Sequence, residues 1–201
     1  MAQYELLIHA HRAVVDGVIQ KAAVTVDGGV ISSVRTGSDA RDIGLAGEHT
    51  IDLGGDVVLM PGLVDPHVCS EDVGVATRSA ARGGVTTVVD YGSDVRPAAT
   101  DAAQVDAWRE AVEGDCAVDT GLWGTAVPGG TGGLAALLDA GVMGVTAVAE
   151  GAGVPGAPTL GADELVAAAE AVAAHGGPLA VDAPAGTVPA LLDVVRRSGG
   201  R

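Results

Sequence analysis

The residues best suited to chemistry lie in one short run, Asp65-Pro66-His67-Val68-Cys69. Side chains two positions apart on an extended strand point to the same face, so we predict that His67 and Cys69 lie side by side. Imidazole nitrogen and thiolate sulfur both ligate zinc, and the pair could therefore hold one metal ion. The spacing alone leaves a second interpretation open, a hydrogen-bonded histidine beside a buried thiol with a structural role.

Three more polar residues, Asp90, Thr146 and Asp182, end predicted strands further along the chain. In parallel α/β folds the working residues gather at the carboxyl ends of the strands, because these ends meet at one edge of the sheet. We therefore expect these three side chains to lie near His67 and Cys69.

The elements that must position these residues alternate in type after residue 56. Strand-like runs are predicted at 57–59, 85–90, 117–122, 144–148 and 179–182. Helix-like runs are predicted at 73–82, 102–113, 132–140, 163–175 and 188–197. Thr131 and Asp163 are the expected N-caps of the third and fourth helices, and glycines follow the first four helical runs where left-handed C-caps belong. The repeated strand–helix unit predicts right-handed crossovers and a parallel sheet.

Residues 1–56 show a different pattern, with short β-type runs at 4–9, 22–26, 30–34 and 50–53. Asp27-Gly28-Gly29 between the second and third runs predicts a hairpin. We thus predict a small N-terminal β-domain at 1–56 and an α/β domain at 57–201. Five strand–helix units fit in the second domain, whereas a closed eight-stranded barrel normally needs about 250 residues. The expected barrel is therefore partial.

Composition restricts the partners. The formal net charge is −15, which argues against nucleic acid and against an anionic membrane surface. The two cysteines are too few for a disulfide framework. Neither a secretory signal nor an uninterrupted apolar run long enough to span a membrane is evident. We expect a cytoplasmic protein.

Longer segments carry a family resemblance. The run VVLMPGLVDPHVC resembles the first barrel strand of the amidohydrolase superfamily, which reads PG-x-x-D-x-H-x-H. The run ATRSAARGGVTTVVD is similar to the next helix and strand of cyclic amidohydrolases: hydantoinases, dihydroorotases and allantoinases. Trp123 and the following Pro-Gly-Gly, with residues 137–183, resemble allantoinases in particular. The resemblance implies a partial TIM-type β/α barrel preceded by a small β-sandwich segment.

The resemblance also implies a chemistry. Such enzymes typically hold two zinc ions on two first-strand His residues, a carboxylated Lys on the fourth strand, and His on the fifth and sixth. An Asp on the last strand is a ligand and a proton shuttle. The metals lower the pKa of a bridging water, whose hydroxide attacks the cyclic amide carbonyl.

This chain departs from that pattern at most positions. His67 matches the first ligand, but Cys69 stands at the second His position, Thr146 at the Lys position and Asp182 at the fifth-strand His position. The sixth-strand His and the last-strand Asp are expected to lie beyond Arg201. A Thr hydroxyl cannot form a carbamate, so a bridged metal pair is not expected. A single zinc on His67, Cys69 and Asp182 stays chemically possible.

Two further aspartates match residues that support the site in relatives. They are Asp65 and Asp90, which we interpret as remnants of that support.

Three hypotheses follow for function. The first is an allantoinase-like homologue that is inactive or strongly impaired and acts as an interaction subunit or a split-gene half. The second is a hydrolase with a rebuilt mononuclear zinc site that opens a cyclic amide such as allantoin or a hydantoin. The third is a decaying gene product. Open strand edges favour a homo-oligomer or a complementing chain as partner.

Overall fold

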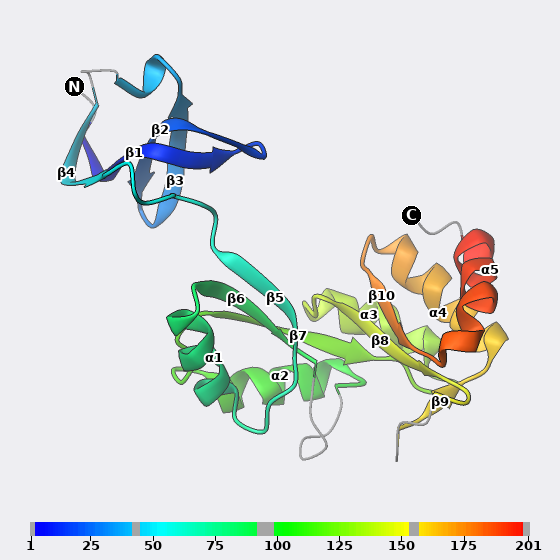
Figure 1. Cartoon of the computed structure of the whole chain (residues 1–201). Helices are drawn as coiled ribbons and strands as arrows, with labels where there is room; N and C mark the ends of the chain where they lie inside the picture. Colours follow the sequence, from blue (N-terminus) through cyan, green and yellow to red (C-terminus); the bar gives the residue numbers. More distant parts are fainter. Residues whose placement is uncertain (1–2, 42–44, 92–98, 153–156, 199–201) are drawn as a thin grey trace. The chain divides into compact units, whose positions relative to one another are not determined.

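The computed structural model describes residues 3–41, 45–91, 99–152 and 157–198 of the chain. The chain folds into two compact units, Met1–Pro61 and Gly62–Arg201. Figure 1 shows a sheet in the first unit and, in the second, a sheet with helices packed along it. Among the described residues, no helix combines the length and apolar character needed to cross a membrane.

The first unit is built on a sheet with the order β3-β2-β1-β4. Its elements are β1 (Gln3–Val15), β2 (Val18–Asp27), β3 (Val30–Thr36), the 3-10 turn η1 (Asp39–Arg41) and β4 (Ala46–Leu53). β1 pairs antiparallel with β2 and parallel with β4. The predicted hairpin at Asp27-Gly28-Gly29 is confirmed, because β2 and β3 pair antiparallel and both glycines have positive φ, 58° and 74°.

The strand predicted at 57–59 is wrong. Leu59 instead pairs with Ala13 of the first unit: its N–H donates to the Arg12 carbonyl at 2.9 Å, and Val14 N–H donates to its carbonyl at 2.8 Å. Pro61 then separates this bridge from the next strand. The parallel sheet begins only at β5 (Leu63–Val68).

The second unit carries five parallel strands in the order β10-β8-β7-β6-β5, and a short strand β9 that pairs with β8. After β5 come α1 (Val73–Arg82), β6 (Val85–Asp90), α2 (Ala102–Val112), β7 (Asp119–Thr125), η2 (Thr131–Gly133), α3 (Leu134–Asp139), β8 (Gly144–Ala149), β9 (Thr159–Leu160), α4 (Ala162–Ala174), β10 (Leu179–Asp182), η3 (Ala185–Thr187) and α5 (Val188–Ser198). The predicted parallel α/β sheet of a partial barrel is confirmed.

Two expected N-caps are wrong. Thr131 lies in the 3-10 turn η2, and the N-cap of α3 is Gly133. The N-cap of α4 is Gly161, whose N–H donates to the Glu164 carboxylate at 3.2 Å. The glycine C-cap pattern is confirmed in the described chain by positive φ at Gly84, Gly114, Gly141 and Gly176.

Alternation along the strands separates two faces of the sheet. On β8, Val145, Ala147 and Ala149 belong to the main hydrophobic core, which also includes residues of α2, α3, α4 and α5. Thr146 lies between them and therefore points to the opposite face. We call this opposite face the inner face. The helices thus cover one side of the sheet. Thr146 lies on the other side, whereas Asp90, expected beside it, faces the helices.

Candidate functional site

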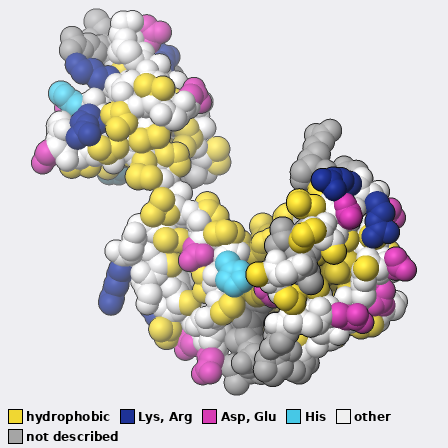
Figure 2. Space-filling model, turned by 45° about the vertical axis from the view of Figure 1, so that its right-hand side comes forward, with side chains coloured by type: hydrophobic (Ala, Val, Ile, Leu, Met, Phe, Trp, Pro, Cys, Tyr) yellow, Lys and Arg dark blue, Asp and Glu magenta, His cyan; other side chains and the backbone are white. Residues whose placement is uncertain are grey.

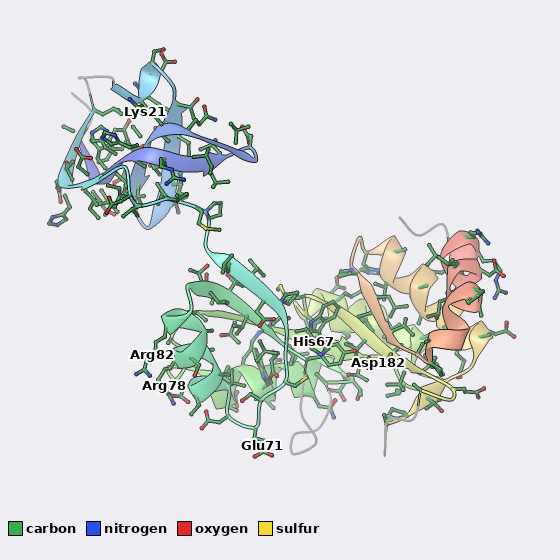
Figure 3. The ribbon with its side chains drawn as sticks, in the orientation of Figure 1. Lys21, His67, Glu71, Arg78, Arg82 and Asp182 are labelled. Carbon is green, nitrogen blue, oxygen red and sulfur yellow. The ribbon has the colours of Figure 1, made fainter. Side chains whose placement is uncertain are left out.

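An aromatic and polar cluster forms at the carboxyl ends of the parallel strands. We call it the Tyr91 cluster; its members are His67, Cys69, Tyr91, Trp123, Thr146 and Asp182. Figure 3 labels two of these side chains, His67 and Asp182, which come from different strands and lie on the same side of the sheet. The second unit therefore brings together all four positions that sequence reasoning matched to metal ligands.

His67 and Cys69 lie on one face, as their spacing predicts. Cys69 Sγ is 3.7 Å from His67 Nε2. The Cys69 side chain is exposed, so the alternative of a buried thiol is wrong. Asp65 accepts a hydrogen bond from the His67 backbone N–H at 3.1 Å, which holds the backbone between the two residues.

Tyr91, directly after β6, links the two ends of this cluster. Its ring stacks on the His67 imidazole with a centroid distance of 4.0 Å and an interplanar angle of 28°. Its hydroxyl donates to Asp182 Oδ2 at 3.0 Å. Burial raises the pKa of Tyr91, the hydrogen bond to Asp182 and the charge of Asp182 raise it further, and a hydrogen bond with Thr146 lowers it in part. Tyr91 therefore keeps its proton further into the alkaline range than an ordinary tyrosine does.

Trp123 on β7 supports the same arrangement from the other side. Its Nε1 donates to the Pro66 carbonyl of β5 at 2.7 Å, and its ring meets the Tyr91 ring edge-on at 6.1 Å. The β5–β6 register shifts between Asp65 and Val68. The indole thus binds a carbonyl at the point where the ladder with β6 is interrupted.

Thr146 occupies the position that the resemblance assigns to a metal-bridging Lys. Its side chain is buried, with 4% exposed. Its hydroxyl donates to the Gly124 carbonyl at 3.1 Å, so the Thr125 hydroxyl, 3.2 Å away, acts as donor to it. These bonds tie β8 to β7, and the side chain offers no amine.

Asp90 lies beneath the cluster and contacts the helix layer. It is 2% exposed, and its Oδ2 accepts a hydrogen bond from Trp108 Nε1 on α2 at 3.0 Å. The aspartate therefore anchors a helix to the sheet, which is one way to support the strand end that carries Tyr91.

The family's metal pair does not fit these residues. Position 146 supplies a hydroxyl in place of an amine, and Asp182 Oδ2 accepts a hydrogen bond from the Tyr91 hydroxyl. Within the ranges that the structure describes, no three His, Cys, Asp or Glu side chains are disposed to share a metal ion. His67 and Cys69 come together, but Asp182 is separated from them by the Tyr91 phenol.

Sequence reasoning missed Tyr91. The available signal was its place one residue after the strand end at Asp90, in a chain with two tyrosines. Parity along β6 places Tyr91 on the face opposite to Asp90. Its contacts with Asp182 depend on the curvature of the sheet, which a residue pattern does not contain.

The comparisons with known proteins agree with this fold. No protein-family model matches the chain. It is 36% identical over 191 residues to an allantoinase from Streptomyces avermitilis, covering 91% of this chain and 42% of that protein. It is also 36% identical over 149 residues to a probable allantoinase from Oryza sativa, covering 69% of this chain and 29% of that protein. The chain thus spans less than half the length of these relatives.

Solved structures define the class. The L-hydantoinase (dihydropyrimidinase) from Arthrobacter aurescens superposes with a TM-score of 0.76 at 25% identity, covering 98% of this chain and 45% of that chain. A D-hydantoinase gives a TM-score of 0.67 at 23% identity, covering 88% and 39%. The fold is thus a partial β/α barrel with a small β unit, as in hydantoinases. With the allantoinase relatives added, the chain belongs to the cyclic amidohydrolase family and resembles allantoinases in particular.

Proposed function

We propose that this chain is a non-catalytic allantoinase-like homologue that works as one subunit of a larger assembly. The observation that carries the proposal is Thr146, whose buried hydroxyl is hydrogen-bonded within the sheet where the family pattern has Lys. Without an amine no carbamate forms, and a metal-activated hydroxide has no bridge to hold it. The remaining donors, His67, Cys69 and Asp182, are arranged around Tyr91.

Open apolar surface supports the assembly part of the proposal. Figure 2 shows hydrophobic side chains at the surface of both units. In the first unit, Val30 and Ile31 of β3 are 67% and 62% exposed. In the second, Val64 at the β5 edge is 61% exposed. Burying such surface is favourable by about 25 cal/mol per Å², so a second copy or a complementing chain is the expected partner.

A hydrolysis assay tests the proposal. The full chain is incubated with allantoin in the presence of added Zn²⁺, and ring opening is followed against buffer with the same metal. We expect no turnover above the buffer rate, because no group described here activates water at the cluster. A Thr146→Val variant, which keeps the size of the side chain, serves as the matched control. Turnover by the parent chain that this variant abolishes would overturn the proposal.

A further inference from the structure

Two donors in the Tyr91 cluster already have the spacing of zinc ligands. Zinc binds sulfur at about 2.3 Å and imidazole nitrogen at about 2.0–2.1 Å, so two such donors on a tetrahedral ion lie about 3.6 Å apart. Cys69 Sγ and His67 Nε2 are 3.7 Å apart. The two side chains could therefore bind zinc without moving apart or together. A third protein donor is what they lack for a zinc site.

The third donor within the cluster is Asp182, and Tyr91 separates it from the pair. The Tyr91 ring lies against His67 at 4.0 Å, and its hydroxyl holds Asp182 Oδ2 at 3.0 Å. The phenol thus fills the space between imidazole and carboxylate. It also occupies the carboxylate oxygen with a hydrogen bond that a metal would have to break.

We propose that Tyr91 is a plug that keeps divalent metal ions out of the space bounded by His67, Cys69 and Asp182. This inference rests on the proposed function and gives a reason against a single bound ion that the Lys position alone does not give. The loss of Lys explains why two metals cannot be bridged, whereas Tyr91 explains why a single ion is excluded too.

Metal binding by three full-length variants tests the proposal, with Co²⁺ as spectroscopic probe and Zn²⁺ for elemental analysis. Tyr91→Ala removes the ring and the hydroxyl. We expect it to bind about one zinc per chain and to show a cobalt–thiolate charge-transfer band. Its affinity for Co²⁺ should exceed that of the parent chain about tenfold or more, because the space filled by the ring between His67 and Asp182 is vacated.

Matched variants separate the contributions. Tyr91→Phe keeps the ring on His67 and is expected to stay as metal-poor as the parent chain. Tyr91→Ala combined with Cys69→Ser is expected to lose the charge-transfer band, which assigns the ion to this thiolate. Tyr91→Val carries the same expectation as Tyr91→Ala and replaces it should the alanine variant fail to melt cooperatively.

Three results would overturn the proposal. They are zinc binding through Cys69 by the parent chain, binding by Tyr91→Phe equal to that by Tyr91→Ala, and no cobalt–thiolate band in either folded small-residue variant. Each is a metal-binding result and is read independently of turnover. Allantoin hydrolysis by a metal-free parent chain would overturn the proposed function and leave the plug supported.

Discussion

At the scale of single residues, the hydrogen bond from Tyr91 to Asp182 connects the two ends of the Tyr91 cluster. The hydroxyl donates to a carboxylate, and the bond is partly buried. Hydrogen bonds to charged groups contribute about 1.5–3 kcal/mol to stability, more than neutral ones. The stacking on His67 restricts the rotation of the Tyr91 side chain and so keeps its hydroxyl near Asp182.

Replacing Tyr91 by Phe tests this bond. We expect Tyr91→Phe to lower the free energy of unfolding by about 1–2 kcal/mol, since the ring stays and one hydrogen bond is lost. Urea unfolding followed by circular dichroism measures the change. Tyr4→Phe, in the other compact unit, is the control and should have a smaller effect. Equal free energies for the parent chain and Tyr91→Phe would contradict the expectation.

The pH dependence of stability is a separate prediction from the same residue. Burial, and then the Asp182 carboxylate, raise the pKa of Tyr91 in the folded chain above the ordinary value of about 10. The unfolded chain therefore loses this proton first as the pH rises. The stabilisation is fully present below about pH 10 and is lost as the pH rises towards the folded pKa.

Urea unfolding at a series of alkaline pH values checks the sign. The free energy of unfolding of the parent chain should fall more steeply above about pH 10 than that of Tyr91→Phe, which lacks the titrating group. Parallel curves for the two proteins would show that Tyr91 is not the group responsible.

At the scale of elements, Thr77 joins α1 to the segment before β7. Its side chain is fully buried, its hydroxyl donates to the Gly74 carbonyl at 2.9 Å, and the Ala117 N–H donates to it at 3.1 Å. A helix residue thus provides the acceptor for a backbone N–H outside its own helix. Loss of this acceptor would leave the Ala117 N–H, which is part-buried in this bond, without its protein partner.

Thr77→Val removes the hydroxyl and keeps the volume. We expect it to lower the free energy of unfolding by about 2 kcal/mol, because the Ala117 N–H loses its partner. Thr77→Ser keeps the hydroxyl and should cost about 1 kcal/mol for the lost methyl. Thermal or urea melts of the two variants decide the order. A larger loss for Ser than for Val would assign the role of Thr77 to packing.

The predictability of the elements follows from their local signals. α1 was expected at 73–82 and lies there, because Asp72 accepts from Val75 N–H at its start and Gly83-Gly84 follow its end. β6 and β10 also match their predicted ranges. The first strand of the parallel sheet was expected at 57–59, but it lies at Leu63–Val68 as β5. Residues 57–59 are apolar, as a strand would be, but the backbone of Leu59 is hydrogen-bonded to Arg12 and Val14 of the first unit. A pattern of residue types does not contain such pairing.

The candidate site was predictable in position but not in contacts. The alternation of strands and helices was enough to place Thr146 and Asp182 on strands of one parallel sheet. It put the first strand at 57–59, yet the structure brings His67 and Cys69 of the β5 segment into the same cluster. That Asp182 accepts from Tyr91 required the spatial order of strands β6, β7, β8 and β10. A contact between β6 and β10, with two strands between them, depends on the twist of the sheet, which a single sequence does not show.

At the scale of the whole chain, both units carry edges that other chains could pair with. In the described part of the second unit, β10 pairs with β8 alone, and β5 pairs with β6 alone. Natural sheets usually cover or charge such edges. The exposed Leu63 and Val64 on β5 give neither kind of protection.

Static light scattering of the pure chain at micromolar concentration tests association. We expect a mass of at least about twice the 19.6 kDa of one chain, because open edges and exposed apolar side chains favour pairing. Dilution should shift the mass downward if a second copy is the partner. A compact monomer with a cooperative melt at every concentration would contradict the expectation.

The Tyr91–Asp182 bond also has a consequence for evolutionary history. Replacing Asp182 by the family's His alone would remove the acceptor of the Tyr91 hydroxyl, and replacing Tyr91 alone would leave the carboxylate without that donor. Each single change therefore leaves one partner of the bond behind, whereas a change of both residues removes the bond as a whole. Such coupling is epistasis between two strands: the cost of a change at either residue depends on which residue stands at the other.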